Sequence, residues 1–179
     1  AYVEMDGEKM SKSLGNVRTV RELLEQYSGE TLRFALLSAH YRSPLNFSKE
    51  LLDNAQATLD GFYLALRNAG DTAAEASDAH LSPVFSALLD DLNTPEAIAE
   101  LHQLAKALNK ASENEKAAAK AALLAGGAVL GILSEDPVAW LSKSDADGDG
   151  LTAEVIDQML IDRAEAKASR DFSRADAIR

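Results

Sequence analysis

The chain has 179 residues, three histidines and no cysteine. This length supports one sizeable core or two small domains, and the missing cysteine excludes disulfides, thiol nucleophiles and thiolate metal ligands. No apolar run approaches the roughly 20 residues that span a bilayer, and charged residues interrupt the first twenty positions. We therefore expect neither a membrane helix nor a secretory signal, and a cytoplasmic location.

The net charge of −11 disfavours a simple nucleic-acid binder, but the charge is unevenly spread. Residues 1–42 hold six basic and six acidic side chains, whereas residues 43–150 hold seven basic and seventeen acidic ones. The excess of acid therefore lies in the middle of the chain.

The first predicted elements are a hairpin and two helices. Residues 2–5 and 8–10 flank Asp6-Gly7, a pair that suits a two-residue turn with positive φ at both positions. After a polar loop, the apolar spacing predicts a helix from Val20 to Tyr27. A second helix is expected over about residues 30–39, and its many apolar residues predict burial on several sides.

From residue 47 the sequence predicts helices alone. Ser48 suits the N-cap of a helix that extends to Asn68. Ser82-Pro83 and Thr94-Pro95 each predict a further helix start. The apolar residues assigned to the first of these two helices are Phe85, Leu88, Leu89 and Leu92. The alanine-rich residues 113–133 complete a bundle, in which Gly126-Gly127 allows a neighbouring backbone to approach closely.

The end of the chain predicts a linker and two more helices. Residues 142–150 have the composition of a linker, and helices are expected from Thr152 and after Ser169. Because Ala1 lies inside a predicted strand and the last helix has no stop signal, we expect a fragment. The predicted fold class is mostly α, with a short N-terminal β-hairpin, a helical bundle and a truncated C-terminal helical hairpin.

Lys9-Met10-Ser11-Lys12-Ser13 carries the strongest chemical signal. Two ammonium groups on a loop of small residues can close on a polyphosphate, to which serine hydroxyls and backbone N–H groups also donate. Such positive charge would stabilise the charge that develops on a leaving pyrophosphate. The alternative is a solvated basic loop.

The string KMSKSLGN, after a hairpin and before a helix, resembles the signature loop of class I aminoacyl-tRNA synthetases. TLRFALLSAHYRSPLNFS at 31–48 and DDLNTPEAIAEL at 90–101 closely resemble the cysteinyl-tRNA synthetase family. LIDRAEAKASRDFSRADAIR at 160–179 is similar to the start of that family's anticodon-binding region. The resemblance covers nearly the whole chain in the expected order.

This resemblance implies a ligase that activates cysteine with ATP and transfers it to its tRNA. Lys12 corresponds to the family's ATP-contacting second lysine and Lys9 to its partner. The nucleotide-binding fold, its HIGH sequence and the zinc ligands are expected before Ala1, so this chain itself should hold no metal site and be inactive alone. The whole enzyme is expected to be a monomer.

The resemblance also implies a division of the chain into five parts. These parts are the end of the catalytic domain (1–16), a stem-contact fold (17–46), a helical bundle (47–141), a linker (142–150) and the start of the anticodon-binding region (151–179).

Arg33, His40, Tyr41 and Arg42 suit a surface that meets the acceptor-stem side of tRNA through phosphate and 2′-OH contacts. Structural alternatives exist for two of them. Arg33 could leave a buried helix by its alkyl stem, and His40 could bind the last carbonyls of that helix.

Two acidic stretches invite other functions. Asp145, Asp147, Asp149 and Gly150 match the first half of an EF-hand loop, but position 12 is Ile156 instead of glutamate, which favours an acidic linker. Asp90-Asp91 precedes a predicted helix start, where acids have a dipole role and Asn93 and Thr94 a capping role. A helical binding module remains the main alternative function, and a calcium-responsive helical protein a more distant one.

Overall fold

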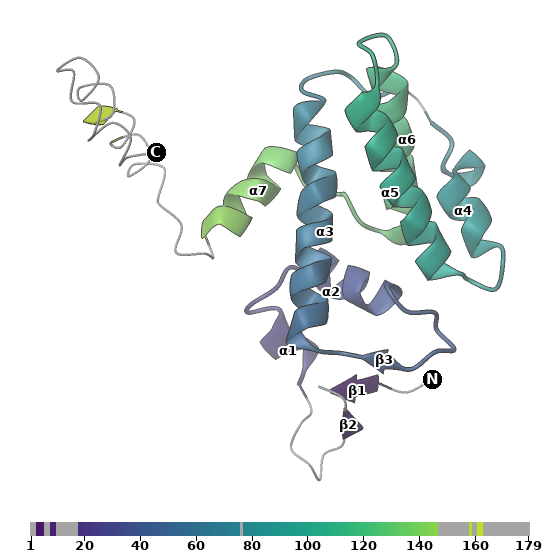
Figure 1. Cartoon of the computed structure of the whole chain (residues 1–179), viewed down its shortest axis with the longest axis vertical. Coiled ribbons are helices and arrows are strands. Elements are labelled where there is room, and N and C mark those ends of the chain that lie inside the picture. The colour runs from purple at the N-terminus through teal and green to yellow at the C-terminus, as the bar shows by residue number, and fades with distance from the viewer. Residues whose placement is uncertain are drawn as a thin grey trace. The chain divides into compact units, whose positions relative to one another are not determined.

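The computed structural model describes residues 3–5, 8–9, 18–75, 77–146, 158 and 161–162. Helices dominate these residues, which confirms the expectation of a mostly α fold (Figure 1). By its contacts the chain divides into two units, Ala1–Val138 and Ala139–Arg179. None of the helices in the described residues is long and apolar enough to cross a membrane.

A small sheet lies at the start of the chain. β1 (Val3–Met5) pairs antiparallel with β2 (Glu8–Lys9), and Met5 opposite Glu8 leaves two residues between the strands, as the predicted hairpin requires. β1 also pairs in parallel with β3 (Leu45–Asn46), so the strand order is β2-β1-β3. The sequence analysis missed β3, because two residues are too few to show an alternating pattern.

Two capped helices follow, and the first is shorter than predicted. α1 (Val20–Leu23) begins with a capping box between Thr19 and Glu22 and buries only Leu23. The predicted extension to Tyr27 is wrong, because Leu24 is half exposed and residues 24–26 form a turn that is followed by a bend at Tyr27. α2 (Gly29–Leu37) starts at Ser28, whose hydroxyl accepts from the Thr31 N–H, and it is buried along most of its length as predicted.

α3 (Lys49–Asn68) is the longest helix of the described residues and matches the prediction at both ends. Ser48 is its N-cap, with the hydroxyl accepting from the Leu51 N–H. Five of its buried residues lie three or four positions apart, which places them on one face of the helix; these are Leu52, Ala55, Leu59, Phe62 and Leu66. Tyr63 and Ala65 widen the buried face toward the end of the helix. Phe62 meets Phe34 of α2 edge to face, with ring centroids 6.2 Å apart.

α4 (Pro83–Leu88), α5 (Thr94–Lys110) and α6 (Lys116–Leu130) pack together in the rest of the first unit (Figure 1). A 3₁₀ turn, η2 (Ala79–Leu81), precedes α4. The predicted apolar stripe of α4 is wrong beyond Leu88, because the helix ends there and Leu89 and Leu92 are exposed. Asp91 and Leu92 instead form a tight turn with positive φ, of 50° and 53°.

Asn93, as predicted, caps α5, with its side chain accepting from the Glu96 N–H at 3.2 Å. Thr94 is the first residue of the helix instead of a cap, and its hydroxyl donates to the carbonyl of Ala39.

The glycines of α6 allow the predicted close approach. A Cβ on Gly127 would lie 3.0 Å from the carbonyl oxygen of Ile132, which returns along the helix end. Gly131, with φ of 68°, ends the helix in the left-handed conformation that favours glycine.

α7 (Pro137–Ala146) crosses the division between the two units. Its last five residues occupy the start of the predicted linker, because no glycine or proline interrupts the chain before Gly148. The helices expected between Thr152 and the end of the chain lie outside the described residues, except that Gln158, Ile161 and Asp162 are helical.

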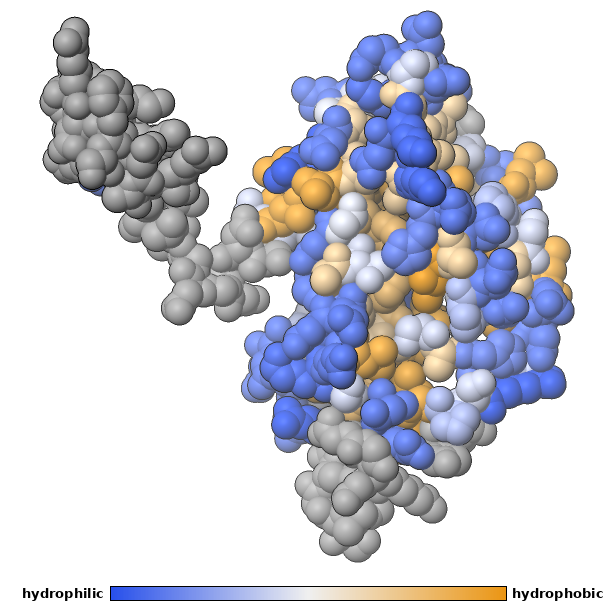
Figure 2. Space-filling model, in the orientation of Figure 1, coloured by the Kyte–Doolittle hydropathy of each residue, from blue (hydrophilic) through white to orange (hydrophobic). Residues whose placement is uncertain are grey.

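Hydrophilic residues cover most of the face shown in Figure 2, with apolar areas between them. Leu81 and Leu89, at either end of α4, are the most exposed large apolar side chains of the described residues, at 83% and 72%.

Candidate functional site

The KMSKS motif begins at the end of the hairpin. Lys9 is the last residue of β2, and its backbone lies opposite Glu4 of β1. The other four residues of the motif, Met10, Ser11, Lys12 and Ser13, lie outside the described residues. The hairpin therefore places the first lysine of the motif beside β1, which β3 holds on its other edge.

α1 is fixed shortly after the motif. The Thr19 N–H donates to the Glu22 carboxylate at 2.8 Å, and this backbone hydrogen bond lowers the pKa of Glu22. The Glu22 N–H donates in return to the Thr19 hydroxyl at 3.3 Å. These two bonds satisfy N–H groups that a helix start otherwise leaves unpaired.

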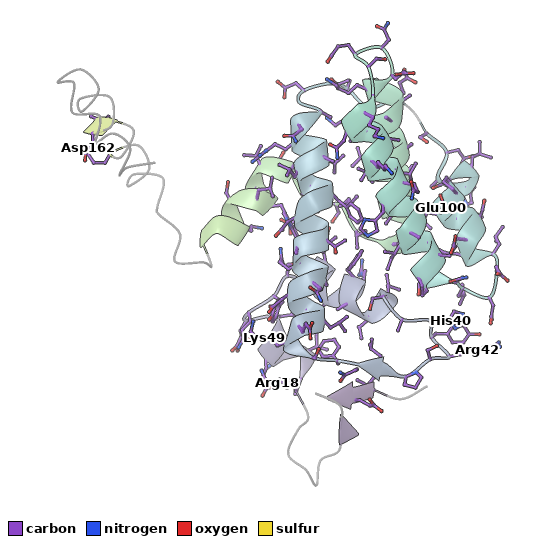
Figure 3. The ribbon with its side chains drawn as sticks, in the orientation of Figure 1. Arg18, His40, Arg42, Lys49, Glu100 and Asp162 are labelled. Atoms are coloured by element: carbon purple, nitrogen blue, oxygen red, sulfur yellow. The ribbon has the colours of Figure 1, made fainter. Side chains whose placement is uncertain are left out.

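A small pocket of about 90 Å³ lies where α1 meets the start of α3. Arg18, Tyr27 and Lys49 are among its lining residues, and Figure 3 shows Arg18 and Lys49 at this end of α3. Lys49 pairs with Asp53 at 2.6 Å, and Tyr27 donates to the same carboxylate at 3.0 Å. The hydrogen bond from Lys49 lowers the pKa of Asp53, so the basic side of this pocket is partly neutralised by an acid.

Arg33, the first of the predicted tRNA contacts, lies on α2 and donates from Nη1 to the carbonyl oxygen of Gly131. That carbonyl belongs to the C-terminal end of α6, where a cation stabilises the helix dipole. The residue is exposed, so its alkyl stem does leave the helix surface, but the guanidinium has an intramolecular acceptor.

His40, Tyr41 and Arg42, the other three predicted contacts, all meet Asp91 of the turn between α4 and α5. We call these four residues the Asp91 cluster. The Tyr41 hydroxyl donates to Asp91 Oδ1 at 2.7 Å, and Arg42 Nη2 lies 3.1 Å from the same oxygen. His40 Nε2 lies 3.0 Å from the Asp91 carbonyl oxygen. The structure thus brings three of the four candidates together and leaves Arg33 at a separate contact.

The hydrogen bonds indicate which atoms of the Asp91 cluster donate and which accept. Because the backbone N–H of Arg42 donates to His40 Nδ1 at 3.3 Å, the proton of the neutral imidazole is on Nε2, which donates to the Asp91 carbonyl. Arg42 Nε donates to the Tyr41 hydroxyl at 2.7 Å. The hydrogen bond to Asp91 raises the pKa of the Tyr41 phenol above its ordinary value.

From the sequence, Asp91 was expected to have only a helix-dipole role, and these contacts were not predicted. Its partners lie 50 residues earlier in the chain, so no local spacing reveals them. The two stretches that carry the family resemblance, 31–48 and 90–101, are in contact at this cluster.

A second pocket, of about 180 Å³, lies beside the Asp91 cluster. Its wall is largely apolar and comes from β1, α2 and the segment that joins α2 to β3; it is lined by Val3, Leu36, Ala39, His40, Tyr41, Ser43 and Leu45. The aromatic rings of His40 and Tyr41 lie 4.8 Å apart at this wall.

A buried carboxylate, which the sequence did not predict, lies elsewhere in the first unit. Glu30, near the start of α2, accepts from the Tyr63 hydroxyl at 2.8 Å and from the Leu133 N–H at 3.1 Å. Ser134 donates to it from its N–H at 3.0 Å and its hydroxyl at 2.6 Å. Burial raises the pKa of Tyr63, and its hydrogen bond to Glu30 acts in the same direction.

Among the described residues, no group of three His, Cys, Asp or Glu side chains could hold a metal ion. In the EF-hand-like stretch, Asp145 is helical and residues 147–150 lie outside the described part of the chain.

Comparisons with known proteins agree with the resemblance. Residues 1–57 match the family model of the class I (C) tRNA synthetase catalytic domain, and residues 84–134 match the DALR domain. Over 99% of its length the chain is 54% identical to a cysteine-tRNA ligase of Saccharophagus degradans and 48% identical to one of Paramagnetospirillum magneticum. It is 46% identical to the cysteine-tRNA ligase of Xanthomonas campestris pv. campestris, again over 99% of its length. The chain spans about 39%, 39% and 38% of the length of these three relatives.

Proposed function

We propose that this chain, which is homologous over 99% of its length to cysteine-tRNA ligases, works as part of such an enzyme. The complete enzyme would activate cysteine with ATP and transfer it to its tRNA. The observation that carries this proposal is the 54% identity over the whole chain, with both family models in the order that the resemblance implies.

The KMSKS motif would bind ATP. We assign the catalytic role to Lys9 and Lys12, which would stabilise the charge on the pyrophosphate as the cysteinyl adenylate forms. Met10, Ser11 and Ser13 would complete the ATP site with backbone N–H groups and hydroxyls. The pairing of β2 with β1 and of β1 with β3 supports this role, because a rigid base reduces the entropy lost when a loop closes on its ligand.

The parts of the chain would divide the work as the family does. Residues 1–16 would end the catalytic domain, 17–46 would contact the acceptor stem and 47–141 would form the helical domain. Residues 142–150 would connect this domain to the anticodon-binding region, which would begin at residue 151. The matches support only a catalytic part followed by a helical part, since the first match runs to residue 57 and crosses two of the proposed boundaries.

Arg33, His40, Tyr41 and Arg42 would meet the tRNA. Exposed arginine and aromatic side chains suit contacts to phosphate, ribose and bases. The resemblance further implies a monomeric, cytoplasmic enzyme. It also implies a zinc site, but the described residues hold no suitable ligand group, so we derive no step through a metal from this chain.

The first test is cysteinylation of tRNA by the full-length protein and its Lys12→Ala variant. Loss of one stabilising contact to the transition state predicts a rate lower by about a hundredfold or more. Lys106→Ala, which removes an exposed lysine of α5, is the matched control and should leave the rate unchanged. The 179-residue chain alone should be inactive.

An active enzyme that tolerates Lys12→Ala would contradict the role of the motif and leave the assignment as a ligase intact. A full-length protein without cysteinylation activity would contradict the assignment itself and favour a helical binding module.

A further inference from the structure

The turn between α4 and α5 adopts an unusual backbone. Asp91 and Leu92 are consecutive non-glycine residues with positive φ, a conformation that persists only where surrounding contacts hold it. At this turn the Asp91 carbonyl and carboxylate bind His40, Tyr41 and Arg42. The next residues reinforce the contact, because the Thr94 hydroxyl donates to the Ala39 carbonyl at 3.3 Å.

Within the Asp91 cluster, three polar groups close a triangle. The Tyr41 hydroxyl donates to Asp91 Oδ1 and accepts from Arg42 Nε, at 2.7 Å in each case. Arg42 Nη2 completes the triangle at 3.1 Å from Asp91 Oδ1, and the guanidinium carbon lies 5.3 Å from the centre of the Tyr41 ring. One edge of the guanidinium is therefore fixed by two neighbours and a ring face.

The opposite edge of the same guanidinium is open. The Arg42 side chain is 67% exposed, and its Nη1 has no hydrogen-bond acceptor among the residues that the structure describes. Figure 3 shows Arg42 beside His40 in the segment that leads from α2 to β3. A guanidinium held on one edge can offer the N–H groups of its other edge to a phosphate, and holding it in advance reduces the entropy lost on binding.

We propose that Asp91 is a positioning residue for tRNA binding: it holds Arg42 and Tyr41 so that the open edge of the guanidinium meets a backbone phosphate. This inference rests on the proposed function, and it adds a residue of the helical domain to the stem-contact surface. Asp91 also carries a negative charge that repels the phosphate. Its hydrogen bonds to Tyr41 and Arg42 therefore favour tRNA binding, whereas its charge disfavours it. Because Asn keeps the acceptor oxygen and removes the charge, Asp91→Asn should retain the positioning.

The test is a double-mutant cycle on the full-length protein, with kcat and KM measured for cysteinylation as tRNA is varied. We expect Arg42→Ala to raise the KM for tRNA about fivefold or more. The slope of the logarithm of the tRNA-binding constant against the logarithm of the salt concentration should become shallower by about the value of one phosphate contact. Asp91→Ala should raise the KM about threefold or more, and the double variant should match Arg42→Ala alone, because Asp91 acts through Arg42.

Two further variants separate positioning from charge and from folding. Asp90→Ala removes an equal charge from the same turn without a contact to residues 40–42, so the KM should not rise. Tyr41→Phe removes the hydroxyl that joins Asp91 to Arg42 and keeps the ring. It should raise the KM as Asp91→Ala does, and it tests the same triangle if Asp91→Ala fails to fold.

The proposal would be overturned if Asp91→Ala raised the KM for tRNA by the same factor in the presence and in the absence of Arg42. Such a result would indicate a purely structural role for Asp91. A lower KM for Asp91→Ala would also overturn it, because Asp91 would then compete with the phosphate for Arg42. An unchanged KM for Arg42→Ala would refute the phosphate contact while cysteinylation itself remained. If the unmodified full-length protein did not cysteinylate tRNA, the result would instead contradict the proposed function.

Discussion

Glu30 accepts four hydrogen bonds inside the first unit, although it is a carboxylate with only 9% of its surface exposed. A buried charge of this kind is costly unless its oxygens are satisfied, and here donors come from α3 and from the residues after α6. Glu30 therefore specifies how the start of α2 meets both of these segments.

Glu30→Gln should destabilise the chain by about 1–3 kcal/mol. The amide replaces one acceptor oxygen with an NH₂ group that would face N–H or O–H donors of Ser134 or Tyr63, so buried donors would lose their acceptor. Urea unfolding of the 179-residue chain measures the change. Glu100→Gln on α5 is the control, since Glu100 makes no side-chain hydrogen bond within the described residues. Equal effects of the two changes would refute the role of Glu30.

Tyr63 predicts a loss of stability at high pH. In the folded chain, burial raises the pKa of the phenol above its ordinary value of 10.0. The hydrogen bond to Glu30 raises this pKa further. A group whose pKa is higher in the folded chain than in the unfolded chain stabilises the fold. This stabilisation is complete below the pKa of the unfolded chain and is lost as the pH rises toward the pKa of the folded chain. The free energy of unfolding should therefore decrease above about pH 10.

Tyr63→Phe checks this expectation. The variant should be less stable at neutral pH, because Glu30 loses a donor, but its stability should decrease less steeply above pH 10. The other tyrosines remain in both proteins and cancel in the comparison. Parallel stability curves for the two proteins in alkali would show that Tyr63 is not responsible.

At the scale of elements, two helical glycines offer a matched pair of substitutions. A Cβ on Gly127 of α6 would lie 2.9 Å from Leu133 Cδ1 and 3.0 Å from the Ile132 carbonyl oxygen, whereas a Cβ on Gly61 of α3 would meet nothing within 4 Å. Alanine gains helix propensity at both positions, but only at Gly127 must it displace backbone.

Gly61→Ala should therefore stabilise the chain by about 0.5–1 kcal/mol, and Gly127→Ala should leave it about 1–3 kcal/mol less stable than Gly61→Ala. Chemical unfolding of the two variants beside the unchanged chain measures both differences. If Gly127→Ala proved as stabilising as Gly61→Ala, Ile132 and Leu133 would be able to move away from Gly127 at little cost in stability, and the close contact would not require glycine.

The elements that the sequence predicted well carry their signals locally. α3 has an N-cap serine and a long apolar stripe, and α5 has Asn93 and Pro95 at its start. α1 and the end of α4 were predicted too long, because the side chains of Leu24 and Leu89 fit an apolar pattern but remain exposed. A pattern of apolar residues shows what a helix could bury, and tertiary contacts decide what it does bury.

At the scale of the whole molecule, the contacts of α2 cross the proposed boundary between the stem-contact segment and the helical domain. Arg33 binds the end of α6, Glu30 binds the residues after it, and the Asp91 cluster joins the other end of α2 to the start of α5. α2 lies in the first matched region, and all of these partners lie in the second, so the two matched family regions are in contact near both ends of α2.

For the candidate site, the sequence identified residues whose role in tRNA contact stays a prediction. It singled out His40, Tyr41 and Arg42 by their chemistry, and the structure places them together at one cluster. It did not predict that Asp91 binds these residues or that Glu30 binds the residues after α6, because the paired groups lie about 50 and 100 positions apart and no spacing rule connects them. The geometry of the KMSKS motif beyond Lys9 stays a prediction.

The long separation between Glu30 and its donors has a consequence for synthesis on the ribosome. Residues 133 and 134 are made 103 and 104 positions after Glu30, which at about 5–20 residues per second takes about 5–20 s. During this interval the carboxylate lacks at least three of its four native donors and must remain hydrated. The start of α2 can therefore reach its final environment only after nearly all of the first unit has been translated.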